Sequence, residues 1–433
     1  MDVVDGAPGS TELRTALMRL DLRLRVAVEN LRAELAERAD DPLRGLYISD
    51  SDVDALLEGV TGAQTGERLL DGSAGAIVGR LDRLAQLFGL DPFEQEAVLI
   101  CLAPEVDLRY ERLYAYLQDD VSRRRPIVNL LLRLLSTSLE ARLDDRQVFG
   151  PAGRLFKSGV LVLADEAAAN WPLLTRPLKL DERIVEYLVG SDELDPRVAS
   201  FARLHLGEQD GQPAPIPAEV RGNLLRLLRA TTATGAGSAI IYVHGPSGAA
   251  KRATIRDACL AAGRPFLLVD VDALVAHGKP VSALDLVGRE ALLQDAILGF
   301  DRFDRLLSDE PESSPIRLAL RALLARRTGP TVLIGEARWE PSAWLPEVRG
   351  IRIEMPALAL TARQQLWHDQ IDGRLPVGEV ADLAARFRLD QEAVRAVSAT
   401  AELGAIWRGG DRVAPGDLRA AARAIAAPPL SGL

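Results

Sequence analysis

Cysteine and long apolar runs are scarce in this sequence. The 433-residue chain has two cysteines, Cys101 and Cys259, and neither belongs to a CxxC or Cys/His cluster. We therefore expect no disulfide framework and no structural zinc site, and a reducing cytoplasm fits this composition. The start MDVVDGAPGS lacks the features of a signal peptide, and no stretch approaches the ~18 apolar residues of a membrane span. We expect a soluble cytoplasmic protein with no membrane partner.

Lysine and histidine are also rare. Of the 52 basic residues only four are lysine, namely Lys157, Lys179, Lys251 and Lys279. Codon bias explains the shortage, but a lysine inside a motif becomes more informative because of it. The four histidines are scattered, so no metal site is expected. The net charge of −10 makes nucleic acid an unlikely partner, since the phosphate backbone is itself negative.

The remaining composition is that of a globular protein. Hydrophobic residues make up 48% and charged residues 26% of a chain long enough for two or three domains. Residues 1–74 should contain an amphipathic helix and a further helical segment. Between Leu13 and Leu35 apolar residues recur at spacings of three and four, which predicts either a short coiled-coil arm or the first helix of a bundle.

Residues 75–206 predict a helical domain with a winged-helix unit. Asp91-Pro92 is a helix start, with Asp as the N-cap. The segment RQVFGPAGRLFKSGVLVLAD predicts a short helix, a turn at Ser158-Gly159 and a β-rich run. Helices followed by a two-strand hairpin are typical of a winged helix. The basic run Arg123-Arg124-Arg125 nearby is either a DNA contact or a solvated face.

A polar segment rich in Gly and Pro, residues 207–217, predicts a linker. Beyond it, short β-runs alternate with helices, which predicts a parallel sheet covered on both faces. The expected strands span 238–244, 265–271, 296–301, 331–336 and 351–355. The predicted organisation is thus a multidomain α/β protein with a P-loop type core over 218–357, a helical lid over 358–425, and a tail or linker over 426–433.

The strand over 238–244 runs into a candidate phosphate loop that opens a helix. Its residues are Gly245, Pro246, Ser247, Gly248, Ala249, Ala250, Lys251 and Arg252. Backbone N–H groups and the helix N-terminus converge on an anion in such a loop. The pattern GxxxxGK[ST] is matched at Gly245 and Lys251, but Ala250 replaces the second glycine and Arg252 replaces the hydroxyl that ligates Mg²⁺. Arginine has no lone pair to offer a metal, so we expect weak or absent Mg²⁺ binding.

The ends of two later strands carry the other groups that hydrolysis needs. Asp301 matches the aspartate of a Walker B strand, on the side of a possible Mg²⁺. Arg302 follows where a catalytic glutamate is expected, and a guanidinium cannot act as a base at neutral pH. Glu336 stands where a polar Asn or Thr should orient water. Loss of the metal ligand, the base and this polar residue together argues against hydrolysis, so we assign no residue as catalytic.

These motifs resemble an AAA+ ATPase module. The segments LRGLYISDSDVDALL, DPFEQEAVLICLAPEVDLRYERLYAYLQDDVSRRRP and GVLVL resemble the winged-helix N-terminal half of bacterial AAA+ proteins associated with contractile injection systems. In that family a degenerate AAA+ module precedes an intact one, so we expect a natural half or an N-terminal fragment of a longer protein. Gly245, Gly248 and Lys251 match the family's phosphate loop, and Asp301 its Walker B aspartate.

The resemblance also implies cofactors and partners. ATP or ADP is the implied ligand, and the implied partners are an active AAA+ module, C-terminal or separate, a homo-oligomeric ring, and a protein substrate or injection-system component. Arg395 falls near a sensor arginine of the lid. Trp344-Leu345-Pro346 replaces the paired arginines that reach a neighbouring subunit's nucleotide, and Arg349 lies close by.

Three functions follow from these observations. The first is an inactive AAA+ module, a pseudo-ATPase, that serves as a scaffold, regulator or adaptor. The second is a working ATPase with an atypical site in which Asp304 or Glu336 activates water. The third is a nucleic-acid-binding regulator that acts through the winged helix and Arg123 to Arg125.

Overall fold

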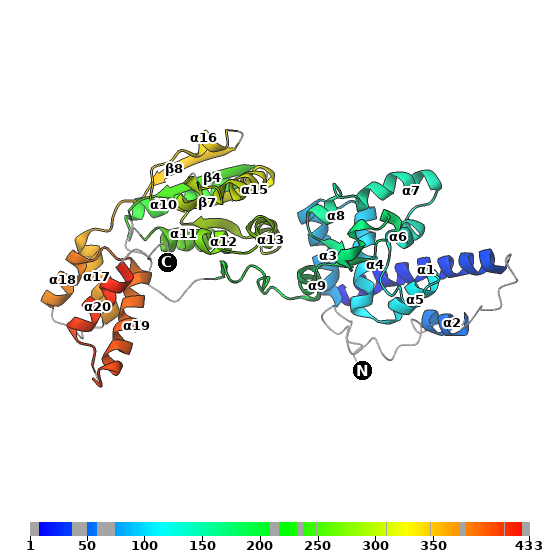
Figure 1. Ribbon diagram of the computed structural model, residues 1–433, viewed down its shortest axis with the longest axis horizontal. Coiled ribbons are helices and arrows are strands. Elements are labelled where there is room, and N and C mark those ends of the chain that lie inside the picture. The colour runs from blue at the N-terminus through cyan, green and yellow to red at the C-terminus, as the bar shows by residue number, and fades with distance from the viewer. Residues whose placement is uncertain are drawn as a thin grey trace. The chain divides into compact units, whose positions relative to one another are not determined.

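The computed structural model describes residues 8–36, 50–58, 74–207, 216–232, 237–246, 250–308, 310–346, 348–371, 377–410 and 412–426. The chain divides into two compact units, residues 1–193 and 194–433, which are described separately (Figure 1).

The first unit is a helical bundle built on one long helix, α1. Its helices are α1 (Pro8–Ala36), α2 (Asp50–Glu58), α3 (Ala74–Phe88), α4 (Pro92–Val106), α5 (Arg109–Leu117), α6 (Val128–Leu135), α7 (Leu139–Asp145), α8 (Arg154–Lys157) and α9 (Glu182–Val189). Leu20, Leu24 and Val28 of α1 are buried, and α1 packs against α3, α4, α5 and α6. Of the two alternatives for this helix, the structure selects the bundle.

Local signals in the first unit act as the sequence predicts. Asp91 caps α4, accepting a hydrogen bond from the amide of Glu94, and Glu94 reaches back to the amide of Asp91. Strands β1 (Leu161–Leu163) and β2 (Leu178–Leu180) then pair antiparallel, with Leu161 opposite Leu180. Two 3₁₀ turns, Glu166–Asn170 and Leu173–Thr175, lie between them, and a third, Arg146–Phe149, precedes α8. The antiparallel pair β1–β2, which follows α8 and the turn at Ser158-Gly159, therefore forms the wing.

The second unit contains a six-stranded sheet of order β3-β5-β6-β7-β4-β8. Its strands are β3 (Ala202–His205), β4 (Ser238–His244), β5 (Phe266–Asp270), β6 (Ile297–Asp301), β7 (Gly329–Gly335) and β8 (Arg349–Glu354). All neighbours are parallel except β3, which pairs antiparallel with β5 at one edge. The five strands predicted from the sequence are all present, and β3 is an addition to them.

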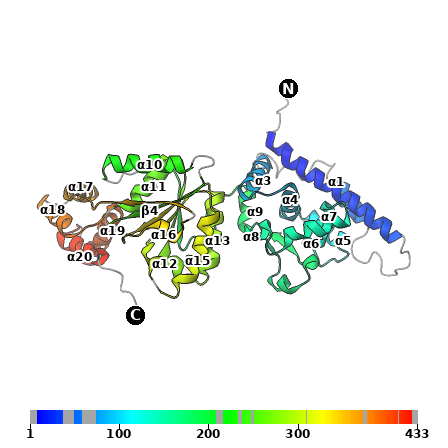
Figure 2. The same ribbon diagram turned by 90° about the horizontal axis from the view of Figure 1, so that it is seen from above.

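Helices cover both faces of this sheet (Figure 2). Along β4, Ile240 and Tyr242 join one hydrophobic cluster while Ile241 and Val243 join the other, because successive side chains of a strand point to opposite faces. One face is covered by α10 (Ala218–Thr232) and α11 (Lys251–Ala261). The other is covered by α12 (Val271–Val275), α13 (Pro280–Leu293), α14 (Asp304–Leu307) and α15 (Ser313–Arg326). A short helix, α16 (Pro341–Trp344), precedes β8.

Four further helices pack around a separate core and form the C-terminal bundle. They are α17 (Leu360–Ile371), α18 (Val377–Arg386), α19 (Gln391–Trp407) and α20 (Pro415–Ala426). Trp367, Leu383 and Val397 are among the residues buried at their centre. This bundle is where the sequence predicts the lid.

The boundary between the units differs from the expected one. The sequence places residues up to 206 in the helical domain, but residues 194–206 lie in the second unit. Asp195 is buried there and pairs with Arg289 of α13 at 3.0 Å, and β3 extends the sheet. Residues 207–217, predicted as the linker, therefore connect β3 to α10 within the second unit.

Candidate functional site

The loop after β4 begins with a turn that only glycine fits. Gly245 has a φ of +157°, and a Cβ built there would lie 2.3 Å from the carbonyl oxygen of Met355. The amide of Met355 donates to the carbonyl of His244 at 2.7 Å, which holds the two segments together. The first glycine of the motif is thus required by packing at the end of β4.

Ala250 takes the left-handed conformation that the second glycine of the motif would adopt. Its φ and ψ are 54° and 27°, a conformation that costs a residue with a Cβ roughly 1–2 kcal/mol. The methyl group is buried and packs in one cluster with Ala253, Leu358 and Leu366. Three residues of the loop lie outside the described part of the chain: Ser247, Gly248 and Ala249.

Lys251, the first residue of α11, folds its ammonium group back over the loop. Its Nζ donates to the carbonyls of Gly245, at 2.6 Å, and Pro246, at 3.0 Å. Burial lowers the pKa of Lys251, and Glu336 and then Asp301 oppose that shift. The structure therefore brings the lysine to the loop and to the acidic ends of β6 and β7.

Arg252 lies between two carboxylates from different parts of the second unit. Its Nη1 is 3.3 Å from Oδ2 of Asp301, and its Nη2 is 3.2 Å from Oε2 of Glu392 in α19. Arg256, one turn later in α11, approaches Glu392 at 3.6 Å. The position that holds a metal-binding hydroxyl in the motif is thus occupied by a cation that already has anionic partners.

Asp301 ends β6 and is largely buried, with 8% of its surface exposed. Burial raises the pKa of its carboxyl, while the neighbouring Arg252 opposes the shift. Arg302 follows in a left-handed conformation, φ 55°, and its guanidinium pairs with Asp270 and lies 3.1 Å from Asp272 at the start of α12. The residue in the place of the catalytic glutamate therefore contacts α12.

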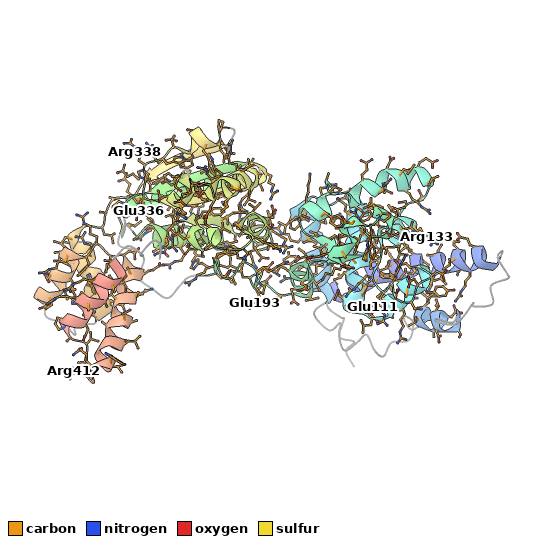
Figure 3. The ribbon with its side chains drawn as sticks, viewed as in Figure 1. Glu111, Arg133, Glu193, Glu336, Arg338 and Arg412 are labelled. Carbon is orange, nitrogen blue, oxygen red and sulfur yellow. The ribbon has the colours of Figure 1, made fainter. Side chains whose placement is uncertain are left out.

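The side chain of Asp304 is hydrogen-bonded to backbone amides that follow β7. Its two carboxylate oxygens accept hydrogen bonds from the amides of Glu336, at 2.7 Å, and Ala337, at 2.8 Å. A Cβ at Gly335 would lie 2.9 Å from both of these oxygens, so a glycine is needed beside them. The side chain of Glu336 is exposed, and Figure 3 shows it at the same end of the sheet as Arg338.

The two arginines expected as a sensor or a finger lie on different elements of the second unit. Arg349 pairs in register with Ala239 at the beginning of β4, which is the opposite end of that strand from Gly245. Arg395 is exposed on α19. The side chain of α19 that does reach the site is Glu392, which the sequence reasoning missed. Its signal was its place in the first turn of a helix capped by Asp390.

The residue set does not fit a Mg²⁺ ion of the usual phosphate-loop kind. The hydroxyl ligand is replaced by a guanidinium, and that guanidinium lies 3.3 Å from Asp301, the one carboxylate assigned to the metal. Arginine offers no acceptor lone pair, and its charge repels a second cation.

The basic run of the first unit is partly neutralised by neighbouring acids. Arg123 lies 3.0 Å from Asp120, and Arg125 lies 2.6 Å from Glu105. Arg124 is exposed. Two of the three charges offered for a nucleic-acid contact are therefore paired within the unit.

Comparisons with known proteins find a family profile that matches part of the chain and solved structures that are similar to it. A family profile described as "Winged helix domain, variant" matches residues 13–202. The crystal structure of the FIGL-1 AAA domain in complex with ADP is similar at 14% identity with a TM-score of 0.40, over 54% of this chain and 89% of that chain. A second crystal structure of the FIGL-1 AAA domain has 15% identity and a TM-score of 0.39, over 62% and 94%.

No curated protein matches the chain. Within the described residues, no helix combines the length and the apolar character needed to cross a membrane. Residues 13–202, which include the wing after α8 and extend to the start of β3, are thus similar to a winged helix domain. The second unit is a parallel-sheet α/β core followed by a helical bundle.

Proposed function

We propose that the second unit is an AAA+-type module that does not hydrolyse ATP and serves as a scaffold, regulator or adaptor. One observation carries this proposal: the Arg252 guanidinium lies on Asp301, where hydrolysis requires a hydroxyl and a Mg²⁺ ion. The loop between β4 and α11, the parallel sheet and the C-terminal bundle support the AAA+ assignment. The fold persists while the chemistry is lost.

Two of the three positions that could activate water support the same conclusion. Arg302 cannot accept a proton at neutral pH, and both carboxylate oxygens of Asp304 accept backbone hydrogen bonds. Glu336 keeps an exposed carboxylate near Lys251. An active ATPase with an atypical site would therefore depend on Glu336.

Nucleotide binding without hydrolysis is compatible with the loop. Gly245 supplies the turn and Lys251 a cation for phosphate, so ATP or ADP is the ligand we propose, bound with little help from Mg²⁺. The partners we propose are an active AAA+ module, on the same or another chain, and a homo-oligomeric ring. A contractile injection system is the cellular setting that the sequence resemblance suggests.

Phosphate release by the purified chain tests the proposal. We expect release by the wild type to equal that of Lys251→Ala, at low and at high protein concentration. The matched control restores the consensus groups by combining Ala250→Gly, Arg252→Thr and Arg302→Glu. It tests whether these groups are sufficient for ATP turnover. Wild-type turnover that Lys251→Ala or Glu336→Gln abolishes would favour the atypical ATPase.

Calorimetry separates binding from hydrolysis. We expect the affinity for ADP to be the same with and without Mg²⁺, because the position of the metal ligand holds a guanidinium. A strengthening of ten-fold or more by Mg²⁺ would contradict the proposed site.

A further inference from the structure

The two residues that depart from the phosphate-loop pattern have a structural feature in common. Ala250 and Arg252 both contact residues beyond the sheet, in the C-terminal bundle or in the segment that leads into it. One contact is apolar and the other is ionic. The same short stretch of chain thus joins the sheet to the bundle in two chemically different ways.

The ionic contact is a chain of alternating charges. It runs from Asp301 at the end of β6 to Arg252, at 3.3 Å, then to Glu392 at 3.2 Å, and on to Arg256 at 3.6 Å. Arg256 also lies 2.9 Å from Asp257. Because Asp301 is mostly buried and Arg252 and Glu392 are each 40% exposed, solvent screens this chain only in part.

The apolar contact lies beside it. Ala250 and Ala253 pack with Leu358 and with Leu366 of α17, and Ile216 packs against the same cluster. A glycine at position 250 would remove the alanine methyl group from this apolar cluster. Burial of the methyl group offsets part of the strain of a left-handed alanine.

We propose that these two residues convert the phosphate loop into a nucleotide-independent latch for the C-terminal bundle. Arg252 supplies, from the chain itself, the positive charge that joins Asp301 to Glu392, and Ala250 supplies apolar contact. The bundle is therefore held on the sheet without any bound ligand. This inference stands on the contacts alone and does not rest on the absence of hydrolysis.

Spin labels on the two sides of the latch test it. The exposed positions Ala261 and Thr400 are changed to cysteine, since both native cysteines are buried. In the full-length chain without nucleotide, double electron–electron resonance should give a single narrow distribution of distances between the two spin labels. We expect Arg252→Ser and Glu392→Gln each to broaden that distribution at least two-fold. Arg395→Ala, an exposed arginine one turn from Glu392, should leave it unchanged.

Some of these variants are expected to disturb folding less than others, so the result does not depend on any single variant. Glu392→Gln preserves size on the surface of α19, and Ala250→Gly alters only the apolar cluster. A distribution that stays narrow in Arg252→Ser, Glu392→Gln and Ala250→Gly alike overturns the latch. ATP turnover by the wild type would refute the proposed function. It would not bear on the latch, because the distances are measured without nucleotide.

Discussion

Two arginines stand where metal-dependent hydrolysis needs a hydroxyl and a glutamate, and each has carboxylate partners of its own. Arg252 pairs with Asp301 and Glu392, and Arg302 pairs with Asp270. The sequence alone predicts that the original groups are lost, because residue type decides that question. It does not predict the partners of the arginines, since Glu392 is 140 positions from Arg252 along the chain (392 − 252) and only the folded bundle brings it near.

Asp301→Asn should make the stability of the second unit less dependent on pH. Burial raises the pKa of Asp301 above its unfolded value, so between the two values the native state binds more protons than the unfolded chain. The free energy of unfolding therefore falls as the pH rises through this window. Asparagine does not titrate, so the variant should gain on the wild type as the pH rises from the unfolded pKa, about 4, through the raised pKa of the folded state. The gain should be about 1.4 kcal/mol for each pH unit that separates the two pKa values.

Tryptophan fluorescence in denaturant measures this difference. Four of the five tryptophans lie in the second unit, so a Trp171→Phe background reports on that unit by itself. Asp285→Asn, which removes a carboxylate paired with Arg326 on the surface, is the control for net charge. Parallel pH profiles for the wild type and Asp301→Asn would contradict the assignment.

At the scale of secondary structure, the strongly patterned elements were predictable and the weakly patterned one was not. Four apolar runs of the parallel sheet, those of β4, β5, β6 and β7, were predictable because both of their faces are largely buried, which makes each run nearly continuous. The fifth strand, β8, lies at the sheet edge and is mostly exposed. β3 has only four residues, Ala202–His205, two of them basic in type, and lies at the sheet edge. Its pairing with β5 is a tertiary interaction that no local pattern records.

The wing shows the same limit. The preceding helix and turn and the first strand of the wing were predictable from Gly159 and the apolar run after it. The second strand, β2, is three residues long and comes after two 3₁₀ turns, so its pairing with β1 has no short hairpin signal.

Reversing the basic run should have little effect on nucleic-acid binding. Arg123 and Arg125 already have acidic partners, so the wild-type run offers little positive charge to a phosphate backbone. Changing Arg123, Arg124 and Arg125 to glutamate alters the net charge by −6 but has little binding to remove. We expect DNA binding weaker than the ordinary non-specific range, about 10⁻⁴ to 10⁻⁶ M, for both proteins at physiological salt. Fluorescence anisotropy over a salt series measures it. Tight wild-type binding that the triple variant loses would favour the nucleic-acid regulator instead.

At the scale of the whole molecule, the chain is built as two units whose boundary lies at residues 193 and 194. A fragment that begins at residue 218 lacks β3 and Asp195, and leaves the edge of β5 uncovered. Breaking a buried ion pair such as Asp195–Arg289 typically costs about 3–5 kcal/mol, and an open strand edge promotes aggregation. We expect fragment 218–433 to melt well below fragment 194–433 and to aggregate.

Thermal unfolding and size-exclusion chromatography compare the two fragments. Asp195→Asn in the longer fragment separates the ion pair from the strand, and should give an intermediate melting temperature. Equal melting temperatures for the two fragments would show that residues 194–217 contribute nothing to the unit.

The antiparallel edge strand also imposes an order in time. β3 leaves the ribosome about 60 residues before β5, its only neighbour in the sheet (266 − 205). At synthesis rates of about 5–20 residues per second, that interval is roughly 3–12 s. During this interval the first unit can form its own core, whereas β3 cannot pair because β5 has not yet been synthesised. The β3–β5 pair is nevertheless the first strand pair of the sheet to be completely synthesised, because each of the other pairs includes β6, β7 or β8. The segment that follows the first unit can therefore be fixed before the rest of the sheet exists.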